Sequence, residues 1–183
     1  RTRNQRDQLQ LLAIHDPLTG ARNRRAMNDE LKIAMASHRR HSDSYGLLVM
    51  DLDHFKQIND RFGHHVGDQV LVAFVELIKR CSRKEDRLFR FGGEEFLLLL
   101  PNTELAGLQA AAQNLLSWVA QELKSPGGAV TVSIGGAILH SGEHWESWLQ
   151  RADECLYRAK SEGRNRAVIA EAPSSPNKTA ASH

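Results

Sequence analysis

Arg90-Phe91-Gly92-Gly93-Glu94-Glu95-Phe96-Leu97-Leu98-Leu99-Leu100 combines a short apolar segment, two glycines, two carboxylates and a second apolar segment. A Gly-Gly pair between two apolar runs predicts a tight primed hairpin turn, because both central residues of that turn need a positive φ. Gly92 and Gly93 also let a ligand lie close to the backbone, since they have no Cβ atoms. Glu94 and Glu95 follow at once, and carboxylates that are buried need a cation beside them. The stretch therefore favours a hairpin that holds a phosphate through Mg²⁺, and the alternative is an ordinary hairpin with solvated glutamates.

Composition is that of one globular domain with a short extension, because the chain has 183 residues, of which 41% are hydrophobic and 25% charged. A formal charge of +2 is too small to indicate nucleic-acid binding by electrostatic attraction alone. Cys81 and Cys155 are too few for a disulfide framework or a metal cluster, which favours a reducing compartment. No apolar run approaches the roughly 20 residues that a membrane span needs. The chain begins without Met, so we expect it to be cut from a longer protein.

Apolar periodicity and turn residues divide the chain into alternating elements. We expect helices over 23–40, 55–61, 68–81, 103–123 and 145–162, and strands over 45–50, 87–91, 95–100, 129–139 and 167–170. Residues 1–14 are predicted to be the end of a linker helix or coiled coil, 15–170 to form the domain, and 171–183 to be a disordered tail rich in Ser, Pro, Ala and Asn. Gly135-Gly136 predicts a bulge within its strand.

The order of these elements indicates an α/β (α+β) domain with a mixed sheet and surrounding helices. Strands joined by the hairpin must be antiparallel, whereas helical crossovers favour parallel neighbours. Asp51 ends one apolar strand, and Glu94 and Glu95 lie at the mouth of the hairpin. If those strands are neighbours, the three carboxylates converge and repel one another unless cations intervene. Hard oxygen ligands favour Mg²⁺ or Mn²⁺, so this edge is predicted to carry out metal-assisted phosphoryl or nucleotidyl transfer.

Five motifs, in order and at fitting spacing between Asp16 and Ile169, resemble those of the GGDEF-family diguanylate cyclases. They are Asp16-Pro17-Leu18-Thr19-Gly20 with Asn23-Arg24, the run from Asp51 to Asp60, Phe62-Gly63-His64 with Gly67-Asp68, Gly92-Gly93-Glu94-Glu95-Phe96, and the run from Tyr157 to Asn165. The resemblance implies a palm-like nucleotidyl cyclase architecture. It also implies that two copies meet as a homodimer, each holding one GTP, and join the two nucleotides into cyclic di-GMP with release of two pyrophosphates.

The resemblance also gives roles to individual residues. It implies that Asp51, Glu94 and the Leu52 carbonyl hold the metal, that Glu94 is a possible base, and that Glu95 is a second acid of the site. Substrate-binding residues implied in the same way are Phe55, Lys56, Asn59, His64, Asp68, Gly92, Gly93, Lys160 and Arg164. Of these, Asn59 and Asp68 would read the guanine edge, because their acceptors match groups that adenine does not offer together. Helix capping is the alternative for both residues.

Arg83-Lys84-Glu85-Asp86 matches the Arg-x-x-Asp motif of the family's inhibitory product site. An arginine can donate two hydrogen bonds to guanine, so Arg83 and Asp86 are expected to bind cyclic di-GMP. A surface ion pair is the alternative. The family often adds an arginine from the following helix, whereas Ala110-Ala111-Ala112-Gln113-Asn114 contains none, and Arg39 or Arg40 could contribute instead.

Two other functional classes remain open. A module of the same fold could sense GTP or cyclic di-GMP without turnover, although the intact Asp51 and Glu94 argue against it. A nucleic-acid-binding domain would need a basic aromatic face, which the sequence does not contain. We expect a cytoplasmic location, an upstream sensor outside this chain, and, for the full-length protein, possible attachment to the inner membrane through regions not included here.

Overall fold

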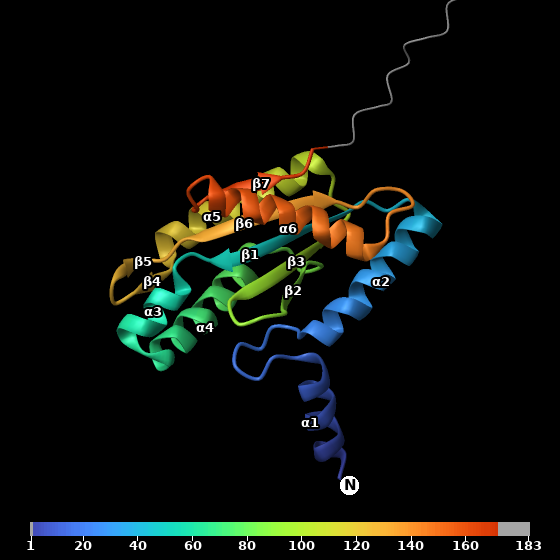
Figure 1. Cartoon of the computed structure of the whole chain (residues 1–183). Coiled ribbons are helices and arrows are strands. Elements are labelled where there is room, and N and C mark those ends of the chain that lie inside the picture. The colour runs from blue at the N-terminus through green and yellow to red at the C-terminus, as the bar shows by residue number, and fades with distance from the viewer. Residues whose placement is uncertain (1, 172–183) are drawn as a thin grey trace, which may run out of the picture.

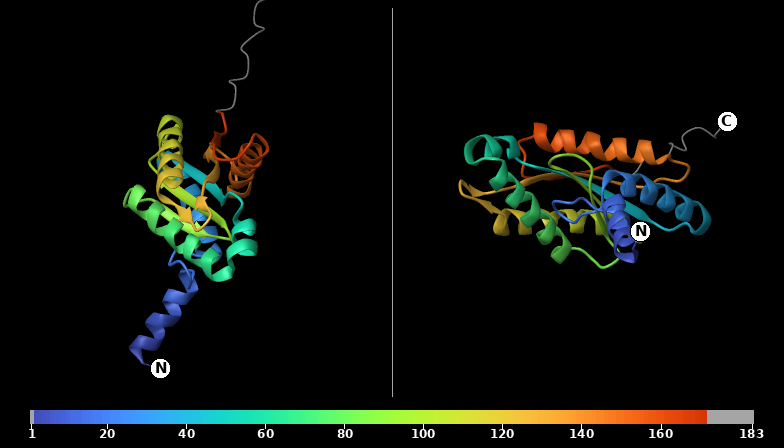
Figure 2. Two further views of the ribbon diagram at one scale, coloured as in Figure 1. Left: turned by 90° about the vertical axis from the view of Figure 1, so that its left-hand side faces the viewer. Right: turned by 90° about the horizontal axis from the view of Figure 1, so that it is seen from below.

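The computed structural model describes residues 2–171 and consists of a central sheet between two layers of helices (Figures 1 and 2). The helices are α1 (Arg3–Ile14), α2 (Arg24–His41), α3 (Phe55–Phe62), α4 (His64–Cys81), α5 (Leu105–Glu122) and α6 (Trp145–Ser161). The strands are β1 (Tyr45–Leu52), β2 (Arg87–Arg90), β3 (Glu95–Pro101), β4 (Lys124–Ser125), β5 (Gly128–Ala129), β6 (Val132–Ile138) and β7 (Ala167–Ile169). The tail predicted over 171–183 lies outside the described residues, apart from Glu171.

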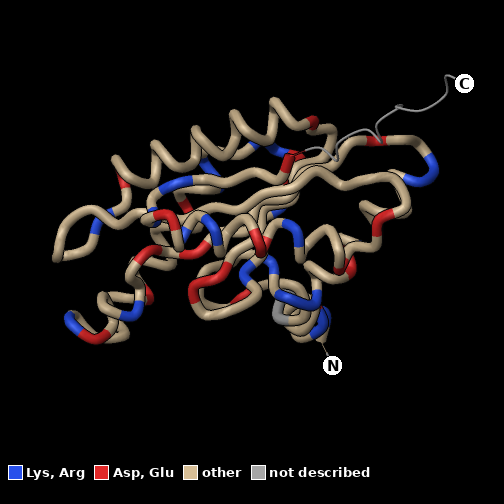
Figure 3. The backbone as a smooth tube through the Cα atoms, turned by 45° about the horizontal axis from the view of Figure 1, so that its top comes forward, with Lys and Arg blue, Asp and Glu red and all other residues tan. Residues whose placement is uncertain are grey.

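The main sheet has the strand order β2-β3-β1-β6-β7. β1 lies at its centre and pairs antiparallel with both β3 and β6, while β6 and β7 are parallel. The predicted mixed sheet with surrounding helices is therefore confirmed. Charged residues lie mainly on helices and loops, and the central strands are mostly uncharged (Figure 3).

Successive side chains of β1 pack into two different cores, because neighbouring residues of a strand point to opposite faces. Leu48 and Met50 pack in the core that includes α3, α4 and α5, whereas Leu47 and Val49 pack in the core that includes α2 and α6. Burial on both faces explains why the sequence of β1 is a continuous apolar run rather than an alternating one.

Gly135 and Gly136 do not form the predicted bulge. Both stay in regular register with β1, opposite Val49 and Leu48. The glycines are required by the neighbouring helix and strand instead, since a Cβ atom on Gly135 would lie 2.2 Å from the backbone nitrogen of Leu156 in α6. The missing side chain therefore lets α6 lie directly on β6.

Two further differences concern helix and strand boundaries. α4 begins at His64, whereas the sequence predicted a start at residue 68. The Ser-Pro-Gly-Gly segment after α5 does more than end the helix, because it forms the turn of a small hairpin made by β4 and β5. α1 projects away from the body formed by the sheet and its two helical layers (Figure 1). Among the described residues, no helix is long and apolar enough to cross a membrane.

Candidate active site

The candidate site lies at the edge of the sheet where β1 ends and β3 begins. Asp51 of β1 is directly opposite Glu95 of β3 and opposite Ser133 of β6. Glu94 precedes Glu95 in the hairpin, so its carboxylate joins the same edge. The structure thus brings together the three acidic residues that the sequence predicted to converge.

The hairpin between β2 and β3 is wider than predicted. Phe91 N–H donates to Glu95 O at 3.1 Å, and neither Gly92 nor Gly93 has the positive φ of a primed turn. Gly92 is needed for steric reasons, because a Cβ atom there would lie 2.2 Å from Glu95 Oε2. Gly93, in contrast, faces open space. The predicted primed turn is therefore wrong, while the prediction of room beside the backbone holds at Gly93.

Carboxylates at this edge are crowded enough to affect one another. Burial, together with the negative charges of Asp51 and Glu95, raises the pKa of Glu94 above its ordinary value, while Lys160 acts in the opposite direction. Burial and the charge of Glu95 likewise raise the pKa of Asp153 on α6. Asp153 is an acidic residue of this cluster that sequence reasoning missed. Its position on an amphipathic helix gave no signal, since an acid there normally faces water.

Lys160 comes from the last turn of α6 and forms an ion pair with Asp51. A buried carboxylate needs such a partner, because burying an unpaired charge is unfavourable. The side chain of Asp51 is only 10% exposed, and that of Lys160 is 34% exposed. An ammonium group therefore balances part of the negative charge at the position where the sequence predicts a metal.

The donor set fits a hard divalent cation in its chemistry, because Asp51, Glu94, Glu95 and the Leu52 carbonyl offer only oxygen. The raised pKa of Glu94 is a second sign of fit, because a cation would offset both the burial of the carboxylate and its repulsion by Asp51 and Glu95, which together raise that pKa. No group of three or more His, Cys, Asp or Glu side chains in the described part of the chain is already arranged around one point.

Asp53 is a buried carboxylate to which sequence reasoning gave no role. It accepts hydrogen bonds from Ser133 Oγ at 2.6 Å, Thr131 Oγ1 at 2.7 Å and Asn165 N–H at 3.0 Å. These bonds attach the loop after α6 to the sheet. Arg164 and Asn165 in that loop have positive φ values of 63° and 46°, so Asp53 holds an unusual backbone conformation next to Arg164. The sequence signal that could have identified Asp53 is its position two residues after Asp51.

Asn59 lies on α3, and its Oδ1 atom is buried with no hydrogen-bond partner among the described residues. Gly67 of α4 lies against it, because a Cβ atom on Gly67 would lie 1.8 Å from Oδ1. A buried acceptor without a donor is unfavourable by about 1–3 kcal/mol, so this oxygen is a candidate for a ligand's N–H group.

Asp68 is exposed within α4 and, with Leu18, lines a hollow of about 370 Å³. The capping alternative is wrong for Asp68 and Asn59, because α4 begins four residues before Asp68 and neither helix has a side-chain cap at its start.

The other predicted ligand residues are placed differently. Phe55 has its side chain in the core, whereas Lys56 and His64 are exposed.

Arg83 and Asp86 are already bound to each other and to the fold. Arg83 N–H donates to Asp86 Oδ2 at 2.8 Å, and Arg83 Nη2 lies 3.3 Å from Asp86 Oδ1. The same nitrogen donates to Pro101 O at 2.9 Å and to Thr103 Oγ1 at 2.7 Å. Burial raises the pKa of Asp86, against the opposing effect of Arg83. This pair lies outside the carboxylate cluster, in the loop that precedes β2.

Comparisons with known proteins agree with this geometry. A family model described as "Diguanylate cyclase, GGDEF domain" matches residues 13–166. The chain belongs to the GGDEF domain family. This confirms the family indicated by the motifs.

Curated relatives of this GGDEF domain include the diguanylate cyclase DgcM of Escherichia coli K12, which is 42% identical over 164 residues, or 90% of this chain and 40% of the relative. DgcP of Pseudomonas aeruginosa is 41% identical over 163 residues, or 86% of this chain and 24% of the relative. The chain thus spans less than half the length of these two relatives.

Solved structures share the fold. The coiled coil and GGDEF domain of DgcB from Caulobacter crescentus, in complex with c-di-GMP, superimposes with a TM-score of 0.84 at 34% identity, covering 92% of this chain and 91% of that one. The active GGEEF domain of a Vibrio cholerae diguanylate cyclase gives a TM-score of 0.76 at 32% identity, covering 80% of this chain and 96% of that one. The GGDEF fold of this chain is therefore established by both sequence and structure.

Proposed function

We propose that this GGDEF domain is a diguanylate cyclase that condenses two GTP molecules into cyclic di-GMP. The observation that carries the proposal is the meeting of Asp51, Glu94 and Glu95 at one edge of the sheet, beside the ammonium of Lys160. Relatives named as diguanylate cyclases support it, since the similarity to them spans most of this chain. Crowded carboxylates with a nearby cation suit the transfer of a phosphate-containing group.

Asp51, Glu94 and the Leu52 carbonyl would hold Mg²⁺ or Mn²⁺, with Glu95 as a further acid. When bound, the metal would neutralise charge on the triphosphate and polarise the phosphate under attack. Lys160 and Arg164 would bind the terminal phosphates by charge-assisted hydrogen bonds. Gly93, which faces open space, would leave room for the α-phosphate, whereas the carboxylate of Glu95 occupies the space beside Gly92. Lys56, His64 and the backbone of Phe55, whose side chain is in the core, would flank the nucleotide.

Asn59 and Asp68 would select guanine. Asn59 Oδ1 is the buried acceptor that lacks a donor, and Asp68 lines the hollow beside Leu18. Guanine presents N1–H and the 2-amino group together, so two acceptors can both be satisfied. Adenine has no hydrogen on N1, and it would leave at least one acceptor unpaired in the site.

The reaction requires two copies of the domain, because each site holds one nucleotide. In each half-reaction a 3′-oxygen forms a bond to the α-phosphorus of the other GTP, and the bond from that phosphorus to the bridging oxygen breaks. The proton of the 3′-hydroxyl passes to a base, for which Glu94 is the candidate, and pyrophosphate leaves. Two such steps give one cyclic di-GMP and two pyrophosphates. A homodimer brought together by an upstream sensor region would control how often the copies meet.

Arg83 and Asp86 would form an inhibitory site for the product. Arg83 is half-exposed despite its internal hydrogen bonds, so its guanidinium remains accessible to a guanine. A GGDEF domain from Caulobacter crescentus has been solved with c-di-GMP, which supports binding of this ligand by the fold.

The test is to incubate the purified domain with GTP and Mg²⁺ and to measure cyclic di-GMP by mass spectrometry. ATP in place of GTP and EDTA in place of Mg²⁺ are the matched controls, and neither should give a cyclic dinucleotide. Because an isolated domain can dimerise weakly, the assay includes a version fused to a dimeric coiled coil. GTP binding without product in both versions would mean that the domain is a sensing module rather than a cyclase.

A further inference from the structure

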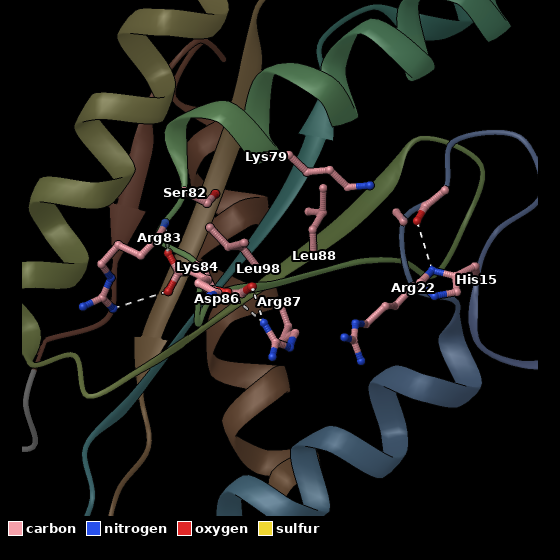
Figure 4. Close-up of a pocket in the computed structure, with 12 residues that line it drawn as sticks. His15, Arg22, Lys79, Ser82, Arg83, Lys84, Asp86, Arg87, Leu88 and Leu98 are labelled. Atoms are coloured by element: carbon pink, nitrogen blue, oxygen red, sulfur yellow. Dashed lines mark hydrogen bonds and ion pairs between the residues drawn. The ribbon is translucent and has the colours of Figure 1, made fainter. Parts of the chain in front are cut away.

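A pocket of about 330 Å³ lies beside β2, at the outer edge of the sheet and away from the carboxylate cluster (Figure 4). Basic side chains from separate parts of the chain line it. They are Arg22 from the turn after α1, Lys79 from the end of α4, Arg83 and Lys84 from the loop that follows, and Arg87 from β2. The proposed catalytic residues do not line this pocket, and Arg83 and Asp86 of the proposed product site do, so the proposed function gives no role to Arg22, Lys79 and Arg87.

Most of these cations have no acidic partner. Among the described residues, no carboxylate lies within 4.0 Å of Lys79, Lys84 or Arg87, whereas Arg22 forms an ion pair with Glu30 at 3.0 Å. The one carboxylate that lines the pocket belongs to Asp86, which Arg83 already binds. The pocket therefore carries an excess of positive charge that the protein itself does not neutralise.

The backbone around the pocket is fixed before any ligand binds. Arg22 N–H donates to Leu88 O at 3.0 Å, and Arg90 N–H donates to Arg22 O at 2.7 Å, so the turn is joined to β2. Arg87 Nη1 donates to Lys84 O at 2.9 Å, which holds its guanidinium in place. On the opposite wall, Lys79 Nζ reaches the turn at Gly20, where an added Cβ atom would lie 3.8 Å away. The guanidinium groups of Arg87 and Arg22 are thus held in place, by Lys84 O and by Glu30, which reduces the entropy lost when an anion binds.

We propose that this pocket binds a small, multiply charged phosphate anion through Arg22, Lys79 and Arg87. Its volume is at the lower end of the roughly 300–1,000 Å³ of ligand pockets, which favours a phosphate or diphosphate over a whole dinucleotide. Arginine and lysine are the residues that bind phosphate oxygens by charge-assisted hydrogen bonds. Pyrophosphate is a small phosphate anion that the proposed reaction releases. The choice of pyrophosphate as the ligand therefore rests on the proposed function, whereas the choice of a phosphate anion rests on the pocket.

Arg83 and Asp86 of the proposed product site also line this pocket, but the Arg83 guanidinium donates to Pro101 O and Thr103 Oγ1, and neither of those two residues lines it. The proposed phosphate ligands Arg22, Lys79 and Arg87 are not among the residues expected to bind cyclic di-GMP. A bound phosphate would contact both the turn that follows α1 and the edge strand β2. It would therefore stabilise the attachment of the N-terminal segment to the domain.

The experiment measures binding without turnover. Pyrophosphate, inorganic phosphate and cyclic di-GMP are each titrated calorimetrically into the chain in EDTA, with no GTP present. We expect pyrophosphate to bind more tightly than phosphate, and the paired change Lys79→Met with Arg87→Gln to weaken pyrophosphate about tenfold or more. The matched control replaces Lys32 and Arg25, which are exposed on α2, by Met and Gln and should bind pyrophosphate as the wild type does. Thermal unfolding checks that each variant is folded, and Lys79→Met alone serves if the pair does not fold.

A second control separates this pocket from the catalytic edge. Lys160 and Arg164 are proposed to bind terminal phosphates at the catalytic edge, so pyrophosphate is also titrated in EDTA into the variant Lys160→Met with Arg164→Gln, where the binding that remains belongs to this pocket. Adding Lys79→Met with Arg87→Gln to that variant should weaken the remaining binding about tenfold or more, and Lys79→Met alone should leave the affinity for cyclic di-GMP intact. Absence of pyrophosphate binding in the Lys160 and Arg164 variant, or no loss of affinity when Lys79 and Arg87 are changed as well, would overturn the proposal. No catalysis is involved, so a failure of the proposed cyclase activity would not produce either result.

Discussion

The guanidinium of Arg90 binds the carboxylate of Asp16, with Nη1 at 3.3 Å from Oδ1 and 3.1 Å from Oδ2. Nε and Nη2 of the same side chain donate to Gly93 O at 3.0 and 2.8 Å. Burial would raise the pKa of Asp16, but hydrogen bonds from Thr19 and Arg90 outweigh it and hold the pKa below its ordinary value. One side chain thus connects the turn that follows α1 to the loop that carries Glu94.

Replacing Arg90 by Lys should disturb this connection while keeping the charge. A lysine cannot bind Asp16 and the Gly93 carbonyl together in the same geometry, because it lacks the planar set of donors. We expect turnover of GTP to fall about tenfold, and the free energy of unfolding to fall by about 1–3 kcal/mol, the range for hydrogen bonds to charged groups. The measurements are initial rates and denaturant unfolding. Arg158→Lys, at an exposed ion pair with Glu162, is the control and should change neither quantity. Normal turnover in Arg90→Lys would mean that the hairpin keeps its position without this link.

Glu94→Gln keeps the size of the side chain and removes a charge that the proposed metal site needs. We expect turnover to decrease by about a hundredfold or more, the order found when a main electrostatic stabiliser is lost. GTP binding should survive in part, because Asn59 and Asp68 are unchanged. Cyclic di-GMP formation is followed by mass, with Glu154→Gln on the exposed face of α6 as the control. A variant that retains most of the wild-type rate would rule out the assigned role of Glu94.

The same substitution should stabilise the metal-free domain at neutral pH. Burial and the charges of Asp51 and Glu95 raise the pKa of Glu94, so the folded state keeps a proton that the unfolded chain has lost. The free energy of unfolding therefore decreases as the pH rises from the ordinary pKa of 4.5 through the raised value. Glu94→Gln removes this contribution, so we expect its melting temperature in EDTA to exceed that of the wild type at pH about 7 and the difference to shrink below pH about 4. Equal melting temperatures of wild type and Glu94→Gln across this pH range would show that the pKa of Glu94 is not raised in the folded domain.

The positions of the acidic residues at strand ends could be predicted because the motifs that contain them are local. Asp51 ends an apolar run, and Glu94 and Glu95 follow a pair of glycines, so their place at strand ends could be predicted from the sequence alone. Their convergence also followed from the fold class, since a hairpin next to a central strand brings the two ends together. The small β4–β5 hairpin was missed, because each of its strands has only two residues and leaves no periodic pattern.

Tertiary contacts account for the errors. Gly135 predicted a bulge, but the reason for the glycine is a helix backbone that packs on it from elsewhere in the chain. Gly92 predicted a primed turn, but the space beside it is occupied by the carboxylate of Glu95. The partners of Arg90 and Asp53 are distant in sequence, at separations of 74 residues for Asp16 and 80 for Ser133, so no local pattern could reveal them.

Asp68→Ala should lower the preference for GTP over ATP. The proposed hydrogen bonds go to guanine groups that adenine lacks, so affinity for GTP should decrease about tenfold or more while that for ATP changes little. Competition binding with both nucleotides measures the ratio. Asp60→Ala, at an exposed position of α3, is the matched control. An unchanged ratio would mean that Asp68 is only a surface residue of α4.

Arg83→Ala should relieve product inhibition and leave early turnover intact. Cyclic di-GMP bound at Arg83 and Asp86 would restrain the encounter of two domains rather than block GTP, so inhibition should be non-competitive. We expect weaker inhibition than in the family at large, because the helix arginine is missing and Arg83 must leave Pro101 and Thr103 to bind a guanine. Calorimetry with cyclic di-GMP compares wild type, Arg83→Ala and the exposed control Arg80→Ala. Equal affinity in all three would identify Arg83 and Asp86 as a structural ion pair.

The hydrogen bonds of Asp53 determine how far this domain can be shortened. Asn165 lies beyond the last residue of α6, yet its N–H group is one of three donors to a carboxylate buried beneath the sheet edge. A fragment cut at the end of α6 would keep every predicted metal ligand but would remove one of the three hydrogen-bond donors to the buried carboxylate of Asp53. A stable fragment should therefore extend at least through Asn165, and an expression boundary placed directly after α6 would fall too early.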